Sequence, residues 1–254
     1  MLDILLRVTY SLLVFVTPLV MSSSTSELFE FNKMLLIYVG AAFVFFFWIL
    51  KMVLSKKIYF KRTILDIPLG LFLFSQIAST IFSIDVHTSL FGYYGRFNGG
   101  LISIIAYLIL YYGFVSNINK SFADKLLKFS LLASFAVILW GIPGHFGHDL
   151  SCLLFLGQFN NSCWTDQFRP AERMFSTLGQ PNWLGAYLAI HFFIGLYFLY
   201  KQFIEKKETK FISKQTVLWV SYLFFNFSAV LFTRSRSALA SVVVSLAIFA
   251  GMLS

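Results

Sequence analysis

Long apolar stretches separated by short polar ones dominate this chain of 254 residues. The strongest stretch, MLLIYVGAAFVFFFWILKMVL, begins at Met34 and carries no charge before Lys51. An apolar run of about 18 or more residues is long enough to cross a bilayer as a helix. We therefore predict eight membrane-spanning helices, at residues 4–21, 34–55, 64–84, 99–117, 124–142, 182–203, 216–233 and 237–254.

The first of these segments allows two interpretations. It reads MLDILLRVTYSLLVFVTPLVMSSS, carries Arg7, and has the general pattern of a signal peptide. The small-residue cleavage pattern of a signal peptide does not follow it, so we favour a helix that is retained. A removed signal peptide stays the alternative.

The composition agrees with a membrane protein. Hydrophobic residues make up 58% of the chain, charged residues only 12%, and the mean hydropathy is +0.78. Soluble domains carry about 25% charged residues, twice that share. We expect an all-α fold, a polytopic transmembrane helix bundle in which residues 1–254 form a single domain.

Basic residues alternate between the two sets of loops, and this alternation predicts the orientation. The set that includes the N-terminus holds fourteen Lys and Arg and five acidic residues, and the other set holds six of each. Because loops rich in Lys and Arg stay in the cytoplasm, we predict a cytoplasmic N-terminus. The net charge of +9 is then an orientation signal, and we expect no nucleic-acid partner.

The longest segment between spans covers residues 143–181 on the predicted outer side. A loop of this length is uncommon unless it has structure or a function, and its apolar content favours a short helix along the outer surface. It contains both cysteines, Cys152 and Cys163. An oxidising outer compartment permits a disulfide between them, worth about 3 kcal/mol or less. Two unpaired thiols are the alternative, and their spacing matches no metal site.

Three predicted helices run from the outer to the inner side, and an arginine-containing polar stretch precedes each one. A helix N-terminus presents unpaired N–H groups and a partial positive charge, so it attracts phosphate, and arginine adds a fork suited to phosphate oxygens. In a continuous helix Arg234 and Arg236 would lie about 200° apart, so we place them in a turn. The candidate anion-binding residues are Arg236, Arg234, Arg96, Ser235, Ser237 and Asn182.

The alternative for a lone outer arginine is a lipid-headgroup contact, which we favour for Arg169 and Arg173. We expect His87, His145 and His148 to be solvated loop residues. His191 lies within a span and is expected to make a hydrogen bond between helices. The chain has no phosphate loop, no Rossmann glycine pattern and no H-E-x-x-H motif, so we expect no metal and no cofactor.

Three segments, YYGRFNGGL, STLGQPNWLGAYLA and LFTRSRSALAS, together resemble the O-antigen ligase and O-antigen polymerase family of bacterial membrane proteins. The resemblance implies a membrane glycosyltransferase fold of about a dozen helices in the bacterial cytoplasmic membrane. It also implies transfer of a glycan from an undecaprenyl-diphosphate carrier to a glycan, lipid or protein acceptor on the outer side. The carrier diphosphate would be held by Arg236 first, Arg234 second and, on a weaker match, Arg96.

One departure from the family limits this expectation. The family has an essential histidine in a large outer loop after further helices, and none of the four histidines here occupies that place. We therefore assign no catalytic residue, and the chain resembles the N-terminal portion of a longer protein. The alternatives are a transporter or flippase for polysaccharide or lipid-linked glycan, and a non-catalytic membrane assembly subunit.

Overall fold

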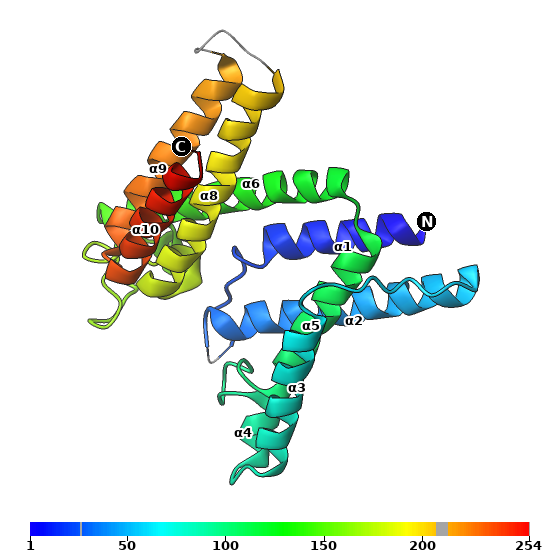
Figure 1. Cartoon of the computed structure of the whole chain (residues 1–254). Coiled ribbons are helices and arrows are strands. Elements are labelled where there is room, and N and C mark those ends of the chain that lie inside the picture. Colours follow the sequence, from blue (N-terminus) through cyan, green and yellow to red (C-terminus); the bar gives the residue numbers. More distant parts are fainter. Residues whose placement is uncertain (26, 207–212, 254) are drawn as a thin grey trace. The chain divides into compact units, whose positions relative to one another are not determined.

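The computed structural model describes residues 1–25, 27–206 and 213–253, and within these ranges the chain forms helices joined by loops, with no β-strand (Figure 1). The all-helical prediction is therefore confirmed. The helices are α1 (Leu2–Val16), α2 (Glu30–Ser55), α3 (Asp66–Ile81), α4 (Val86–Phe91), α5 (Leu101–Asn117), α6 (Lys120–His145), α7 (Leu150–Leu156), the 3₁₀ turn η1 (Ser176–Leu178), α8 (Pro181–Lys206), α9 (Lys214–Thr233) and α10 (Arg236–Leu253).

Each of the eight predicted spans coincides with one of these helices, but the helices differ in length. In the described ranges α2, α6, α8 and α9 are long and apolar enough to cross a membrane. The apolar helices α3, α5 and α10 are shorter; the 16 residues of α3 rise only about 24 Å, less than a typical hydrocarbon core. Four helices thus indicate a membrane protein, whereas eight crossings and a cytoplasmic N-terminus stay predictions.

Residues 1–129 form the first of two compact units. Its helices α1 and α5 both pack on α2, around a core of Leu6, Tyr10, Val44 and Leu126. The helices come close because Gly113 lacks a side chain; a Cβ there would lie 2.6 Å from a methyl of Val44. The hydroxyl of Tyr10 is satisfied by donating to the carbonyl of Leu110 at 2.8 Å.

Residues 130–254 form the second unit. Its helices α8 and α9 lie side by side along most of their length, and α10 packs on α8 (Figure 1). Glycines again permit the close approach: a Cβ on Gly195 would lie 2.9 Å from the ring of Tyr222. The first turns of α8 and α10 carry the candidate site.

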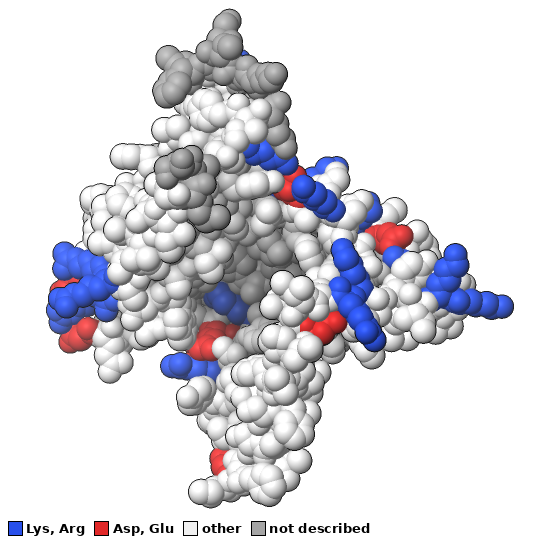
Figure 2. Space-filling view, in the orientation of Figure 1, with Lys and Arg blue, Asp and Glu red and all other residues white. Residues whose placement is uncertain are grey.

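The surface of the protein suits a hydrocarbon environment. Large apolar side chains such as Phe46, Phe74 and Phe224 are more than half exposed, at 59%, 71% and 67%. Figure 2 shows that charged side chains occupy small, scattered parts of the visible face and that most of it is uncharged. An apolar surface of this extent in water would favour aggregation, whereas a bilayer would cover it.

Candidate functional site

The link between α9 and α10 is a tight turn that carries both arginines of the 231–241 segment. Arg234 ends α9 in the left-handed conformation, with φ 50° and ψ 30°, and its N–H donates to the carbonyl of Leu231. Ser235 follows, and Arg236 is the first residue of α10. The two guanidinium groups are therefore carried by a turn and not by one continuous helix, and both side chains are exposed.

Ser235 shapes the start of α10. Its side chain is almost fully buried, and its hydroxyl oxygen accepts from the N–H of Ala238 at 3.4 Å. Its own N–H donates to the hydroxyl of Thr233 at 3.2 Å. Ser235 is thus occupied in capping the helix, while the exposed Ser237 lies 3.2 Å from it, hydroxyl to hydroxyl.

Arg173 joins the ends of two helices at this place. One of its terminal nitrogens donates to the amide oxygen of Asn182, in the first turn of α8, at 3.0 Å. Its Nε donates to the carbonyl of Thr233, at the end of α9, at 3.2 Å. The next residue, Met174, donates its N–H to the carbonyl of Phe232 at 2.9 Å. The loop before α8 is therefore fixed to the turn between α9 and α10.

Gly185 brings the first turns of α8 and α10 together. A Cβ on this glycine would lie 2.7 Å from the Cβ of Ala238 and 3.0 Å from that of Ser235. The beginnings of two helices consequently lie next to each other, each with the partial positive charge of its unpaired N–H groups. Both helix ends and Arg173, Arg234 and Arg236 form what we call the arginine cluster.

A surface depression of about 360 Å³ lies in this cluster. Its lining combines the two arginines of the turn with aliphatic side chains of both helices: Val230, Leu231, Arg234, Ser235, Arg236 and Leu239. Within the described part of the chain, neither Arg234 nor Arg236 forms an ion pair. The depression therefore offers available positive charge beside an apolar wall.

Arg169 and Arg96 differ from this pair because acidic groups balance them. Arg169 contacts Asp166 at 3.2 Å and Glu172 at 3.0 Å, and these carboxylates raise the pKa of its guanidinium. Arg96 lies in the first unit, 3.6 Å from a carboxylate oxygen of Glu30. Of the predicted residues, the structure thus brings together Asn182, Arg234, Ser235, Arg236 and Ser237, all of them in the second unit.

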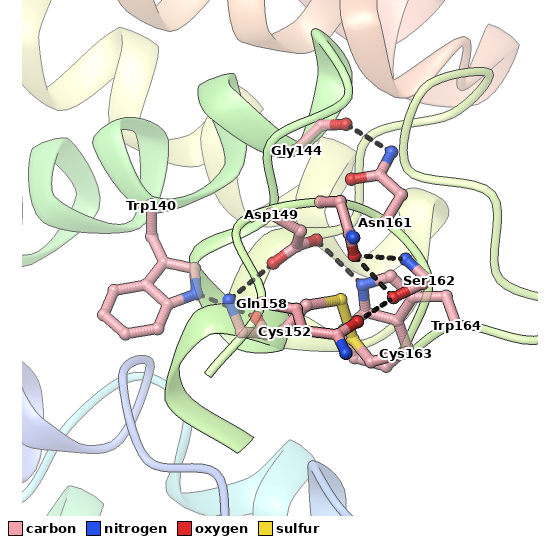
Figure 3. The surroundings of a disulfide bond; sticks show 11 residues. Trp140, Gly144, Asp149, Cys152, Gln158, Asn161, Ser162, Cys163 and Trp164 are labelled. Atoms are coloured by element: carbon pink, nitrogen blue, oxygen red, sulfur yellow. Dashed lines mark hydrogen bonds between the residues drawn. A yellow bond between two sulfur atoms is a disulfide. The ribbon is translucent and has the colours of Figure 1, made fainter. Parts of the chain in front are cut away.

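The two cysteines form a disulfide that closes the loop after α7, with their Cα atoms 5.3 Å apart (Figure 3). The buried carboxylate of Asp149 holds both sides of this loop. One oxygen accepts from the N–H of Ser151 at 2.6 Å, and the other accepts from the indole of Trp164 at 2.9 Å. The 143–181 segment is therefore structured, and α7 is the short helix expected in it.

The histidines have structural partners. The buried His191 pairs through Nε2 with the hydroxyl of Ser130 at 2.6 Å and through Nδ1 with the carbonyl of Tyr187 at 2.7 Å. His145 stacks on Phe232, with ring centres 4.3 Å apart. Among the residues that the structure describes, no three His, Cys, Asp or Glu side chains are grouped so that they could hold a metal ion.

Sequence reasoning missed the role of Arg173, which we expected to contact lipid headgroups. The segment FRPAERMF contains the residue, but nothing in it indicates a contact with Thr233, sixty positions later.

Comparison of the chain with family models, with curated proteins and with solved structures gives no match. The function is therefore argued from the arginine cluster.

Proposed function

We propose that this chain belongs to a membrane glycosyltransferase of the O-antigen ligase and polymerase type, and that its arginine cluster binds the diphosphate of an undecaprenyl-diphosphate-linked glycan. In this proposal all eight apolar helices cross the bacterial cytoplasmic membrane and the N-terminus is cytoplasmic. The cluster then faces the outer side, where the glycan would pass to an acceptor hydroxyl.

The observation that carries the proposal is the pair of unpaired arginines at a place where two helices begin. In the described chain these two arginines have no acidic neighbour to neutralise them, so their charge is available to a ligand. A diphosphate would accept their N–H groups in the bidentate geometry that guanidinium favours. The first N–H groups of α10, which begins at the depression, add donors of the same kind.

The backbone of Arg234 supports a role for its side chain. A non-glycine residue at φ 50° occupies a conformation that favours glycine, and such strain costs about 1–3 kcal/mol. Glycine at this turn would remove the strain together with the guanidinium. The presence of arginine is therefore consistent with a use for its charge.

The lining of the depression fits a lipid carrier. Val230, Leu231 and Leu239 lie beside the arginines, so a ligand with both a phosphate head and a hydrocarbon tail would meet matching groups. A soluble nucleotide or sugar phosphate would leave the apolar wall uncovered. This combination favours a prenyl diphosphate over a water-soluble anion.

In this proposal the arginine cluster would assist the reaction by stabilising the leaving group. Transfer breaks the bond between the anomeric carbon and the diphosphate oxygen, and the acceptor oxygen forms the new bond to that carbon. Negative charge develops on the departing diphosphate, where fixed guanidinium groups stabilise it. The acceptor proton would go to a base, and we assign that base to no residue of this chain.

Binding of undecaprenyl diphosphate to the chain in lipid nanodiscs tests the proposal directly, because binding needs no catalytic base. We expect Arg236→Ala to weaken binding roughly 10- to 100-fold, the effect of losing a hydrogen bond to a charged group. Arg169→Ala is the matched control, since that arginine is already paired, and it should bind as the original chain does. Equal affinity of Arg236→Ala and the original chain would overturn the proposal.

Two further readouts separate the alternative functions and the orientation. Proteoliposomes supplied with lipid-linked glycan and acceptor yield product for a transferase, translocated lipid alone for a flippase, and neither for an assembly subunit.

Single cysteines at positions 96 and 236, in a chain without Cys152 and Cys163, should react with an impermeant maleimide from the outer side. Reaction from the cytoplasmic side alone would exclude the proposed topology.

A further inference from the structure

A second pocket, of about 270 Å³, lies within the first unit between α3, α4 and the loop that follows α4. Its lining consists of uncharged polar groups, two glycines and one aromatic ring: Gln76, Ser79, Thr80, Thr88, Ser89, Gly92, Tyr93 and Gly99. We call it the hydroxyl pocket. It has no side chain in common with the arginine cluster.

The polar lining from α3 is a stripe on a largely apolar helix. Gln76, Ser79 and Thr80 are spaced by three and four positions, so they share one face. Polar side chains facing hydrocarbon are costly, and the exposed Phe72 and Phe74 on the same helix indicate lipid around it. The stripe is therefore best explained by a polar space beside it, which is where the pocket lies.

The hydrogen bonds around the pocket leave both donors and acceptors available. Thr80 donates its hydroxyl hydrogen to the carbonyl of Gln76 at 2.8 Å, and Thr88 donates its own to the carboxylate of Asp85. Both hydroxyls therefore retain only lone pairs for a ligand. In the described part of the chain the amide of Gln76 and the hydroxyl of Ser79 have no hydrogen-bond partner, so they can donate as well as accept.

An aromatic ring and a fixed loop complete the pocket. The side chain of Tyr93 is 70% exposed, and its ring carbons lie 3.8 Å from where a Cβ on Gly99 would be. The loop is closed by a bond from the N–H of Tyr93 to the carbonyl of Asn98 at 3.1 Å. Gly92, at φ 87°, permits that closure, because a Cβ there would overlap the same carbonyl.

We infer that the hydroxyl pocket binds one neutral sugar ring. A sugar presents several hydroxyls that donate and accept, which matches Gln76, Ser79, Thr80 and Thr88, and its C–H face can lie against the ring of Tyr93. The volume is below the roughly 300–1,000 Å³ of pockets for drug-sized ligands, so it suits a single ring. Since the lining carries no charge, and Asp85 lies behind Thr88, an anionic ligand is disfavoured.

The inference rests on the proposed function for the origin of the sugar, which would belong to the donor or acceptor glycan. Recognition of the ring itself depends only on the pocket. A free glycoside can therefore test the pocket without a lipid carrier, and a diphosphate lipid can test the arginine cluster without a sugar.

Saturation-transfer NMR with the chain in nanodiscs tests the pocket. The probes are the methyl glycosides of glucose, rhamnose and N-acetylglucosamine, with myo-inositol as a polyol that represents a lipid headgroup. We expect transfer to the ring protons of at least one glycoside, with titrated affinity roughly two- to tenfold weaker in Gln76→Leu and in Thr88→Val, as for the loss of one hydrogen bond. Ser75→Ala, an exposed change on the same helix outside the pocket, is the control.

Three outcomes would overturn the inference: no transfer to any glycoside, equal affinity in the pocket variants and the control, or transfer to myo-inositol alone. The two proposals fail separately. If the pocket variants lose the glycoside while Arg236→Ala retains undecaprenyl diphosphate, the pocket stands and the carrier proposal falls. If the glycoside signal is absent while Arg236→Ala loses the lipid, only the pocket falls.

Discussion

Arg173 donates from its guanidinium to the amide oxygen of Asn182, 3.0 Å away, and so connects the loop before α8 to the first turn of that helix. The same guanidinium donates from Nε to the carbonyl of Thr233 at the end of α9. A cation is favourable at a helix C-terminus, so the contact with Thr233 stabilises the Arg173 side chain in its place at the end of α9. One side chain thus fixes the distance between the start of α8 and the arginine-bearing turn.

We predict that Arg173→Ala weakens binding of undecaprenyl diphosphate roughly two- to tenfold, less than Arg236→Ala, because Arg173 positions the two helix ends and does not line the depression. The melting temperature should change little, since Arg173 is exposed. Nanodisc binding and thermal unfolding measure the two effects. Arg173→Lys separates charge from geometry: its single ammonium cannot reproduce a fork to two oxygens, and full recovery by lysine would contradict the positioning role.

The close contact of α8 with α10 at Gly185 leads to a second prediction. Gly185→Val should lower the free energy of unfolding by about 1–3 kcal/mol, as for overpacking, because its Cβ would lie 2.7 Å from that of Ala238. Separating the two helix starts should also weaken diphosphate binding. Tryptophan fluorescence during heating measures the unfolding.

Gly70→Val is the matched control for this change. Gly70 also lies in an apolar helix, but a Cβ there would meet no atom within 4 Å. We expect its unfolding midpoint to stay at or above that of the original chain, because valine restricts the unfolded state more than glycine does. Equal melting of the two variants would show that α8 and α10 do not pack as described.

A network of hydrogen bonds between buried polar side chains of α6 and α9 leads to a third prediction. The hydroxyl of Tyr222 pairs with that of Ser134 at 2.6 Å and accepts from the amide of Asn226 at 3.3 Å. Tyr222→Phe should destabilise the protein by about 0.6 kcal/mol and at most about 1.7, the range for hydrogen bonds between membrane helices. Thermal unfolding in nanodiscs measures the loss.

Asn226→Leu should have the opposite effect. Asn226 is fully buried, and in the described chain its amide oxygen has no hydrogen-bond partner. Leucine removes this unsatisfied oxygen and loses the 3.3 Å bond to Tyr222, whose hydroxyl keeps its partner Ser134. We therefore expect the change to be neutral or stabilising. A clear loss of stability in Asn226→Leu would indicate that the oxygen has a partner, such as a buried water molecule.

The helices of this protein could be predicted from the sequence because a local signal determines them. Long apolar runs with few charges place all eight segments. The Arg234–Arg236 spacing predicts a turn, since a continuous helix would direct the two side chains apart. The helix α4 was not predicted, because six residues are too few to show a 3.6-residue period. Its one local sign is Asp85, whose side chain caps the helix by accepting from the N–H of Thr88.

The site could be predicted only in part, because its assembly depends on contacts that are distant in the sequence. Arg173 reaches Thr233, and Gly185 meets Ser235 and Ala238, and in each case the segments in between reveal nothing of the contact. A glycine within an apolar run looks neutral until the opposing helix is known. The hydroxyl pocket was missed for another reason: Gln76 and Thr88 belong to different helices, and the second of these, α4, was not predicted.

The disulfide between Cys152 and Cys163 leads to the last prediction. Replacing both by serine should increase protease cleavage between residues 153 and 162 and lower the free energy of unfolding by less than about 3 kcal/mol, the value for a closed loop of 15 residues. The loss should stay below that limit because Trp164 still bonds to Asp149, and Asn161 to the carbonyl of Gly144 (Figure 3). Limited proteolysis and thermal unfolding measure the two effects.

The same bridge also tests the proposed orientation. Cysteines in a cytoplasmic loop are kept reduced, whereas an outer loop permits their oxidation. The chain isolated from cells and denatured without reductant should therefore not react with maleimide, and Cys152→Ser should expose one reactive thiol at Cys163. Two reactive thiols in the original chain would contradict both the bridge in cells and the outer position of this loop, and with it the side of the membrane proposed for the arginine cluster.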